Sequence, residues 1–195
     1  MSTTHLEGLH ARLVARADDE GLLDIAYRVV DSPVGRLLLA ATEQGVVRVG
    51  FEGEGHDRVL AELAERVSPR VLRSPARLDG AARWLEAYFA GHGPGPEVPL
   101  DLRLLAGYRR EVVTALPRIP FGRTATYAQM AAMTGRPRAV RAVGSACAHN
   151  PVPLLLPCHR VVRSDGGTGG YRGGAEAKEL LLRLEASAAG RTVAP

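Results

Sequence analysis

The first half of the chain alternates short apolar, β-branched runs with turn-forming residues. Three runs have the length and composition of strands: IAYRVV (25–30), GRLLLAAT (35–42) and GVVRVGF (45–51). Because Ser-Pro-Val-Gly and Glu-Gln-Gly separate them, we expect them to pair as hairpins. Apolar residues with helical spacing follow at 56–67 and 76–90. The pattern predicts a small α/β domain with an antiparallel sheet.

The second half is predicted to be mostly helical. Apolar spacing indicates four helices, over 107–117, 126–134, 138–148 and 175–187. Thr124 or Thr126 is suited to cap the second helix, and Gly135 ends it. The second and third helices, joined by this short turn, have the arrangement of a helix-turn-helix. A β-like Val-Val-Arg follows Arg160, and the chain as a whole is predicted to have an α+β fold.

We divide the chain into five parts. Segment 91–99, GHGPGPEVP, breaks all periodicity and is typical of a linker between domains. The predicted parts are an N-terminal extension (1–23), an N-terminal α/β domain (24–93), a linker (94–102), a C-terminal helix-turn-helix domain (103–189) and a tail (190–195). Within the extension, residues 5–17 are expected to form a short amphipathic helix.

Composition narrows the class of protein. The chain is 46% hydrophobic and 24% charged, as in ordinary soluble domains. No apolar run could cross a membrane, and the polar N-terminus does not resemble a signal peptide, so we predict a cytoplasmic protein. The two cysteines, Cys147 and Cys158, are too few for a disulfide framework, and neither belongs to a CxxC pair that would indicate structural zinc.

Charge is distributed unevenly along the chain. Residues 1–102 hold 11 Arg and 16 acidic residues, a net charge of −5, whereas residues 103–195 hold 13 Arg, one Lys and 5 acidic residues, a net charge of +9. A basic half of this kind favours a polyanionic partner such as nucleic acid. A solvated basic face in an Arg-rich chain is the alternative, since only one of the 25 basic residues is Lys.

The predicted helix 138–148 is unusual in the size of its side chains. Six of its residues are small: Ala139, Ala142, Gly144, Ser145, Ala146 and Ala148. Small side chains let a helix backbone approach another surface closely. That surface is either a neighbouring helix or the floor of a DNA groove, and the residues alone do not choose between them.

Cys158 is a candidate nucleophile. A Cys that ends an apolar run is most often a buried hydrophobic residue, but His159 is a potential base and Arg160 a fixed positive charge, and both favour a thiolate. In a continuous strand, neighbouring side chains point to opposite faces, so a turn at Pro157 or a bridging water would have to connect Cys158 with His159. The Gly-rich loop 164–174 can close over a small ligand but lacks the spacing of a phosphate-binding loop.

The second half resembles a known family. The motifs GRPRAVRAVGSACAHNPVP, LLLPCHRVV and SDGGTGGYRGG closely resemble the C-terminal domain of the O6-alkylguanine-DNA alkyltransferases, and PCHRV after NPVP is highly specific for them. The resemblance is strong over about 103–187. It is weaker over 25–90, where DSPVGRLLLAAT resembles the opening hairpin of the family's N-terminal domain, and residues 1–23 lie outside it.

The resemblance implies roles in a single-use transfer of an alkyl group from guanine O6. Cys158 would be the acceptor, and its thioether product has no good leaving group. His159 would take the thiol proton through a water, and Glu185 would orient the imidazole. Tyr127 would donate a proton towards N3 of the departing guanine, and Asn150 would tie the helix-turn-helix to the active-site segment.

The resemblance also implies how the partner, alkylated double-stranded DNA, is bound. Guanine O6 in a duplex cannot reach a buried thiol, so the nucleotide would be flipped out, with Arg141 filling the vacated stack. The small-residue helix would lie in the minor groove. The DNA-binding residues are predicted to be Arg138, Ala139, Arg141, Ala142 and Gly144.

A guanine pocket is expected beside the acceptor. Its lining would be Pro153, Val161, Tyr171, Arg172 and Gly173. Because Pro153 and Gly173 leave space, adducts larger than methyl should be tolerated. No cofactor is expected, and no metal, because the N-terminal half has no Cys where larger eukaryotic members build a zinc site.

Three alternatives remain open beside this hypothesis. The first is an alkyltransferase-like protein that binds lesions without transfer, although such proteins lack the acceptor Cys that this chain has. The second is a helix-turn-helix regulator, for which the small-residue helix offers few base-reading side chains. The third is a Cys-His hydrolase, which would turn over repeatedly. We expect a monomer in solution that does not bind membranes, with cooperative binding along DNA left open.

Overall fold

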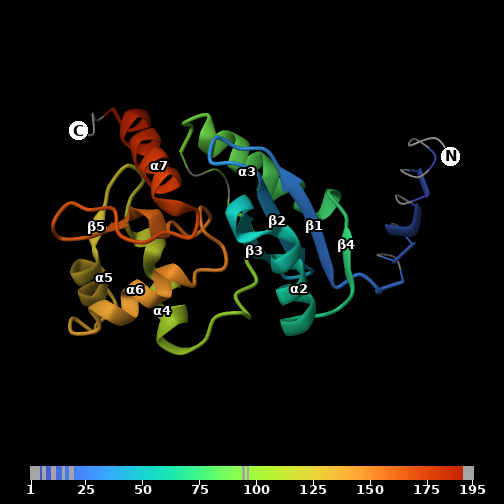
Figure 1. Cartoon of the computed structure of the whole chain (residues 1–195), viewed down its shortest axis with the longest axis horizontal. Coiled ribbons are helices and arrows are strands. Elements are labelled where there is room, and N and C mark those ends of the chain that lie inside the picture. The colour runs from blue at the N-terminus through green and yellow to red at the C-terminus, as the bar shows by residue number, and fades with distance from the viewer. Residues whose placement is uncertain are drawn as a thin grey trace.

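The computed structural model describes residues 5, 8–9, 12–14, 16–17, 20–93, 95 and 97–190. The sheet domain lies on the right of Figure 1, and helices α4, α5, α6 and α7 lie on the left. Of the helix predicted over 5–17, the described residues are helical, and its other positions lie outside the described residues. The predicted tail, apart from Gly190, also lies outside them.

The N-terminal sheet has the strand order β3-β2-β1-β4. Its strands are β1 (Ile25–Val30), β2 (Leu37–Thr42), β3 (Gly45–Phe51) and β4 (Val71–Arg73). The antiparallel pairs β1–β2 and β2–β3 confirm the predicted hairpins. Strand β4, which pairs parallel to β1, was not predicted.

Strand β2 lies inside the sheet, and its side chains point alternately into two separate hydrophobic cores. Leu38 packs with Val59 and Leu63 of helix α2 (His56–Arg66) on one face. Leu37 and Leu39 face the other side, with helix α3 (Asp79–Phe89) and the C-terminal helices. Because helices cover both faces, all six residues of β2 are buried.

The C-terminal half confirms the predicted helices. They are α4 (Gly107–Ala115), α5 (Tyr127–Met133), α6 (Val140–Ala148) and α7 (Gly174–Ala188). Thr126 caps α5, because its side chain accepts from the backbone of Gln129 while the Gln129 side chain accepts from Thr126 N. The short strands β5 (Ala125–Thr126) and β6 (Val161–Val162) pair in parallel. The predicted α+β fold is therefore confirmed.

The described part of segment 94–102 is attached to the edge of the sheet. Val46 N donates to Pro99 O over 2.8 Å, and Asp101 N donates to Val46 O over 2.9 Å. A Cβ at Gly45 would lie 2.2 Å from Pro99 O, so only glycine permits this approach. One hydrophobic core joins this sheet to the C-terminal helices. The five-part division of the chain stays a prediction, but segment 97–101 is not a free tether. Among the described helices, none is both long and apolar enough to span a membrane.

Candidate active site

Cys158 begins a single turn of 3-10 helix, Cys158–Arg160, between an apolar loop and β6. The loop is held closed by Asn150, whose amide donates to Leu156 O over 2.7 Å and whose side-chain oxygen accepts from Val152 N over 3.1 Å. Leu154 has a φ of +73° although it is buried, which marks local backbone strain just before the turn. No strand runs through Cys158, so its neighbours are not constrained to opposite faces.

The thiol of Cys158 is almost completely shielded, with 2% of the residue exposed. Burial raises its pKa, and the side chain of Asn150 and the charge of Lys178 oppose that rise. The resting group is therefore a neutral thiol that needs a base to become a nucleophile.

His159 supplies a base in the same turn. It is fully buried, and its Nε2 lies 2.7 Å from Oε1 of Glu185 on α7. Its Nδ1 is also buried and has no hydrogen-bond partner among the described residues. Burial lowers the pKa of His159 and the Glu185 carboxylate opposes this, so the imidazole is neutral at rest.

Glu185 lies at the centre of a buried hydrogen-bond network. It accepts from Tyr88 Oη over 2.7 Å, from Arg160 Nε over 2.9 Å and from Gly122 N over 2.9 Å, in addition to His159. Burial raises the pKa of this carboxyl, but the hydrogen bond from His159 and the hydrogen bonds and charge of Arg160 outweigh it and bring the pKa to about 2. Glu185 is therefore ionised at neutral pH.

Two cationic side chains near the site make contacts that were not predicted from the sequence. Arg160, expected to favour the thiolate, instead binds Glu185 and donates from Nη1 to Ile119 O over 2.8 Å. The cations that lower the pKa of Cys158 are Lys178 of α7, which was not predicted from the sequence, and to a smaller extent Arg172. Lys178 is fully buried, donates to Val161 O over 2.7 Å and also binds Thr168 O. Its position in a helix gave no signal, since a Lys at such a position is usually exposed.

Tyr127, the first residue of α5, lies where α5, α6 and the Gly-rich loop meet. A Cβ at Gly169 would lie 2.7 Å from its Oη, and a Cβ at Gly144 of α6 would lie 3.9 Å from its ring. Lys178 Nζ is 6.0 Å from the ring centroid. Burial raises the pKa of Tyr127, so its phenol is protonated and can donate.

Residues predicted for the guanine pocket lie beside this turn. Pro153 and Val161 are buried, and the Tyr171 ring is edge-on to His159 at 6.3 Å between centroids. The buried Tyr171 hydroxyl has no hydrogen-bond partner among the described residues. Arg172 binds Ala148 O at the end of α6.

One expectation for the pocket is corrected. A Cβ at Gly173 would lie 2.6 Å from the Phe51 ring, so Gly173 accommodates β3 and does not leave open space. Gly173 therefore does not make room for adducts larger than methyl.

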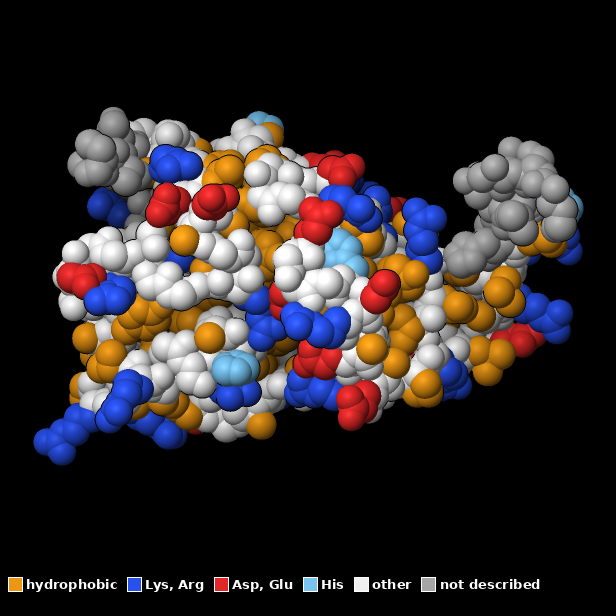
Figure 2. Space-filling model, viewed as in Figure 1, with side chains coloured by type: hydrophobic (Ala, Val, Ile, Leu, Met, Phe, Trp, Pro, Cys, Tyr) orange, Lys and Arg blue, Asp and Glu red, His pale blue; other side chains and the backbone are white. Residues whose placement is uncertain are grey.

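The predicted DNA-binding residues lie on or next to α6. Arg138, Arg141 and Ala142 are exposed, whereas Ala139 and Gly144 are half-buried. Lys and Arg side chains gather at the lower left of Figure 2, below the α5–α6 region. The helix-turn-helix thus presents a basic surface built on small residues.

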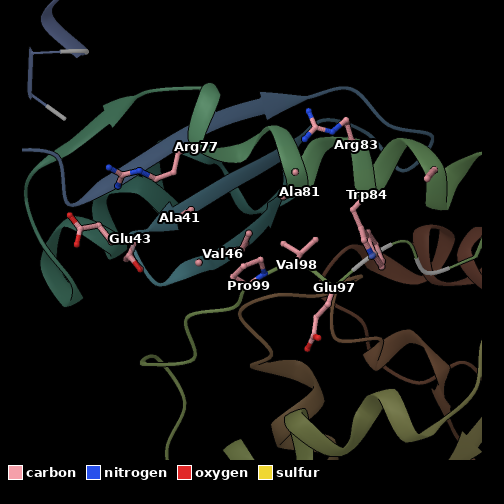
Figure 3. A pocket seen from close by; sticks show the side chains of 14 residues that line it. Ala41, Glu43, Val46, Arg77, Ala81, Arg83, Trp84, Glu97, Val98 and Pro99 are labelled. Carbon is pink, nitrogen blue, oxygen red and sulfur yellow. The ribbon is translucent and has the colours of Figure 1, made fainter. Parts of the chain in front are cut away.

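A cavity of about 460 Å³ lies elsewhere, between α3, the β2–β3 hairpin and segment 97–99 (Figure 3). Trp84, Arg83 and Glu97 line it, and it contains none of the predicted site residues. Among the described residues, no cluster of three His, Cys, Asp or Glu side chains could hold a metal ion.

Comparison with known proteins covers both halves of the chain. Residues 25–102 match the family model for the ribonuclease-like domain of 6-O-methylguanine DNA methyltransferase, and residues 107–187 match its DNA-binding domain. The methylated-DNA–protein-cysteine methyltransferase of Methanosarcina barkeri is 39% identical over 163 residues, covering 82% of this chain and 96% of that protein. The human protein of the same name is 38% identical over 169 residues, covering 83% and 81%.

Solved structures with a similar fold belong to the same kind of protein as these relatives. The crystal structure of Mycobacterium tuberculosis O6-methylguanine methyltransferase matches with a TM-score of 0.74 and 36% identity, covering 88% of this chain and 96% of that one. A structure of the M. tuberculosis protein in complex with DNA matches with a TM-score of 0.72 and 37% identity, covering 84% and 94%. The fold and these relatives thus define a protein-cysteine methyltransferase with a DNA-binding domain. The chain belongs to the methylated-DNA–protein-cysteine methyltransferase family.

Proposed function

We propose that this protein repairs DNA by moving an alkyl group, methyl above all, from O6 of guanine to Sγ of Cys158 in a single turnover. The observation that carries the proposal is the shielded thiol in one turn with a buried His159, whose Nε2 is held by an ionised Glu185. Nucleophile, base and orienting carboxylate in this order are the components of an activated cysteine.

The reaction balances as a displacement at carbon. The thiol proton passes to His159 Nδ1 through a water, Sγ forms a bond to the alkyl carbon, and the bond from that carbon to O6 breaks. Tyr127 gives its proton towards N3 of the guanine, so that the base leaves neutral, and the proton held by His159 returns through solvent to the Tyr127 phenolate. The thioether has no good leaving group, so each molecule reacts once.

We propose that α6 enters the minor groove and that Arg141 fills the stack vacated by the flipped nucleotide. The exposure of Arg141 and Arg138, and the small side chains beside them, support this placement. Asn150 would hold the Cys158 loop relative to α6 through its two hydrogen bonds. We further propose a monomer in solution and a cytoplasmic location.

Intact-mass measurement after incubation with a duplex containing O6-methylguanine tests the transfer. We expect the protein to gain one methyl group, Cys158→Ala to gain none while still binding DNA, and the matched control Cys147→Ala to gain one. A Cys158→Ala variant that still takes up methyl would show that the acceptor is misassigned. Binding without any gain by the natural chain would instead support a lesion-binding protein.

The stack-filling role of Arg141 is tested by comparing two substrates. Arg141→Ala should slow transfer from duplex DNA by about 10-fold or more, because flipping costs a few kcal/mol, while transfer from the free base O6-methylguanine stays within about two-fold. Arg83→Ala, an exposed arginine on α3, is the control and should leave both rates unchanged. Equal losses on both substrates would refute the role.

A further inference from the structure

Tyr88 belongs to α3, in the N-terminal half, yet its hydroxyl lies in the active-site network. The side chain is fully buried. Its Oη donates to Glu185 Oε1 over 2.7 Å and lies 3.3 Å from His159 Nε2. The proposed transfer of the alkyl group assigns no role to Tyr88.

Four aromatic contacts hold the Tyr88 ring in place, one of them an edge-on contact with Phe89 at 5.3 Å between centroids. The Tyr88 ring stacks on Trp84 with 5.3 Å between centroids and an angle of 7° between planes. Phe121 meets it edge-on at 6.0 Å, and the His159 ring does so at 6.3 Å. The hydroxyl therefore cannot turn away from the carboxylate without unpacking the ring.

The contacts define which nitrogen of His159 is the base. An ionised carboxylate only accepts hydrogen bonds, so Nε2 must donate to Glu185 and the lone pair of the neutral ring is on Nδ1. Tyr88 donates to the same Oε1 atom. Arg160 Nη2 also donates to this oxygen, over 3.1 Å. The Tyr88 donor draws further charge from the oxygen and weakens its attraction for the imidazole proton.

We propose that Tyr88 is a positioning residue by which the N-terminal domain sets the orientation and proton affinity of His159 through Glu185. The inference rests on the proposed transfer to Cys158. It means that the N-terminal domain takes part in the chemistry and does more than support the DNA-binding half.

Several other groups contact Glu185 or His159, or change the pKa of His159. Arg160 and the backbone of Gly122 bind Glu185, and Lys178 and Arg160 both lower the pKa of His159. Tyr171 faces the imidazole from the Gly-rich loop. None of these contacts depends on the Tyr88 hydroxyl, so its removal isolates one donor.

The test is the pH dependence of single-turnover transfer in Tyr88→Phe, which keeps the ring and removes only the hydroxyl. Without the Tyr88 hydroxyl, Glu185 binds the imidazole proton more strongly. The acid limb of the rate profile should then move up by about half a unit to one unit, a 3- to 10-fold slower rate on that limb. On the alkaline plateau the rate should stay within about two-fold.

If Tyr88 had only a structural role, Tyr88→Phe would lower the rate at every pH without shifting the acid limb. That result would overturn the inference. Tyr108→Phe removes a hydroxyl bound to Thr134 Oγ1 at 2.7 Å, away from Glu185, and should not move the limb. If the natural chain transfers no methyl, the proposed function fails; if it transfers and Tyr88→Phe has an unshifted limb, only this inference fails.

A second measurement needs no variant. Imidazole nitrogen NMR of the natural chain should show His159 protonated on Nε2 and bare on Nδ1. The opposite tautomer would overturn the inference even if Tyr88→Phe did not fold.

Discussion

At the scale of single residues, Glu185 shows how a buried charge is kept ionised. Its carboxylate is 1% exposed, and it accepts hydrogen bonds from four groups, on Tyr88, Gly122, His159 and Arg160. Desolvation alone would favour the protonated acid, so the low pKa reflects stabilisation of the charged form, chiefly by His159 and Arg160. The same donors make the residue important for stability.

This predicts a stability change in acid. The pKa of Glu185 falls from 4.5 to about 2 on folding, so its contribution is present above pH 4.5 and is lost as the pH falls towards 2. The difference of about 2.5 units corresponds to about 3 kcal/mol. Glu185→Gln should lower the free energy of unfolding by about 3–5 kcal/mol at pH 7, and its deficit relative to the natural chain should shrink by about 3 kcal/mol between pH 5 and pH 2.

Urea unfolding at a series of pH values checks this. Glu179→Gln, on the same helix and paired with Arg183 at the surface, should change the free energy of unfolding by less than about 0.5 kcal/mol. A deficit for Glu185→Gln that stays constant with pH would contradict the assignment of the low pKa.

The sequence made some of these residues predictable. Cys158, His159 and Glu185 were named from the PCHRV motif and the family resemblance, and the structure brings the three together. Tyr88 and Lys178 were missed because each lies in an ordinary helical pattern. Their role depends on contacts with residues far away in the chain, Glu185 and Val161, which no local pattern encodes.

At the scale of elements, long periodic segments were predictable and short pairings were not. The helices appear because 3.6-residue spacing persists over several turns. Strands β4 and β5 have only three and two residues, too few for a period, and are defined by their partners. Strand β6 is equally short, but it lies within the predicted β-like Val-Val-Arg. The turn at Cys158–Arg160 likewise depends on Asn150 closing the preceding loop.

The contact between the Gly-rich loop and β3 gives a prediction at this scale. Gly173 has ordinary backbone angles, φ −79° and ψ 3°, so alanine is excluded only by the Phe51 ring. Gly173→Ala should lower the free energy of unfolding by about 1–3 kcal/mol through overpacking. Thermal or urea unfolding measures the loss.

The control is Gly170→Ala in the same loop, where a Cβ would meet nothing within 4 Å; it should cost less than about 0.5 kcal/mol. In a Phe51→Leu background, Gly173→Ala should cost less than in the natural chain. Purely additive losses would mean that Phe51 is not the obstacle.

At the scale of the whole molecule, charge separates the two halves. Residues 1–102 carry a net −5 and residues 103–195 a net +9. Residues 1–102 include the sheet, and residues 103–195 include helices α4, α5, α6 and α7 (Figure 1). The basic half includes the exposed Arg138 and Arg141 on or next to α6. A polyanion is therefore expected to bind the C-terminal half in preference to the N-terminal half.

Binding to DNA should consequently weaken as salt rises. A plot of log binding constant against log salt should have a negative slope, and Arg138→Ala should reduce its magnitude by about 1 for one lost phosphate contact. Arg58→Ala on α2 should leave the slope unchanged, because that exposed arginine belongs to the acidic half. Fluorescence anisotropy with an unmodified duplex measures these salt slopes. Equal slopes for the natural chain and Arg138→Ala would contradict the placement of Arg138 at a DNA phosphate.

The burial of Cys158 has a consequence for a protein that reacts only once. A sulfur atom that keeps its proton and is closed off from water is a poor target for electrophiles and oxidants dissolved around it. Only a substrate carried into the interior on a nucleotide meets it beside a base. The unreacted population is thereby preserved for lesions instead of being depleted by chance encounters.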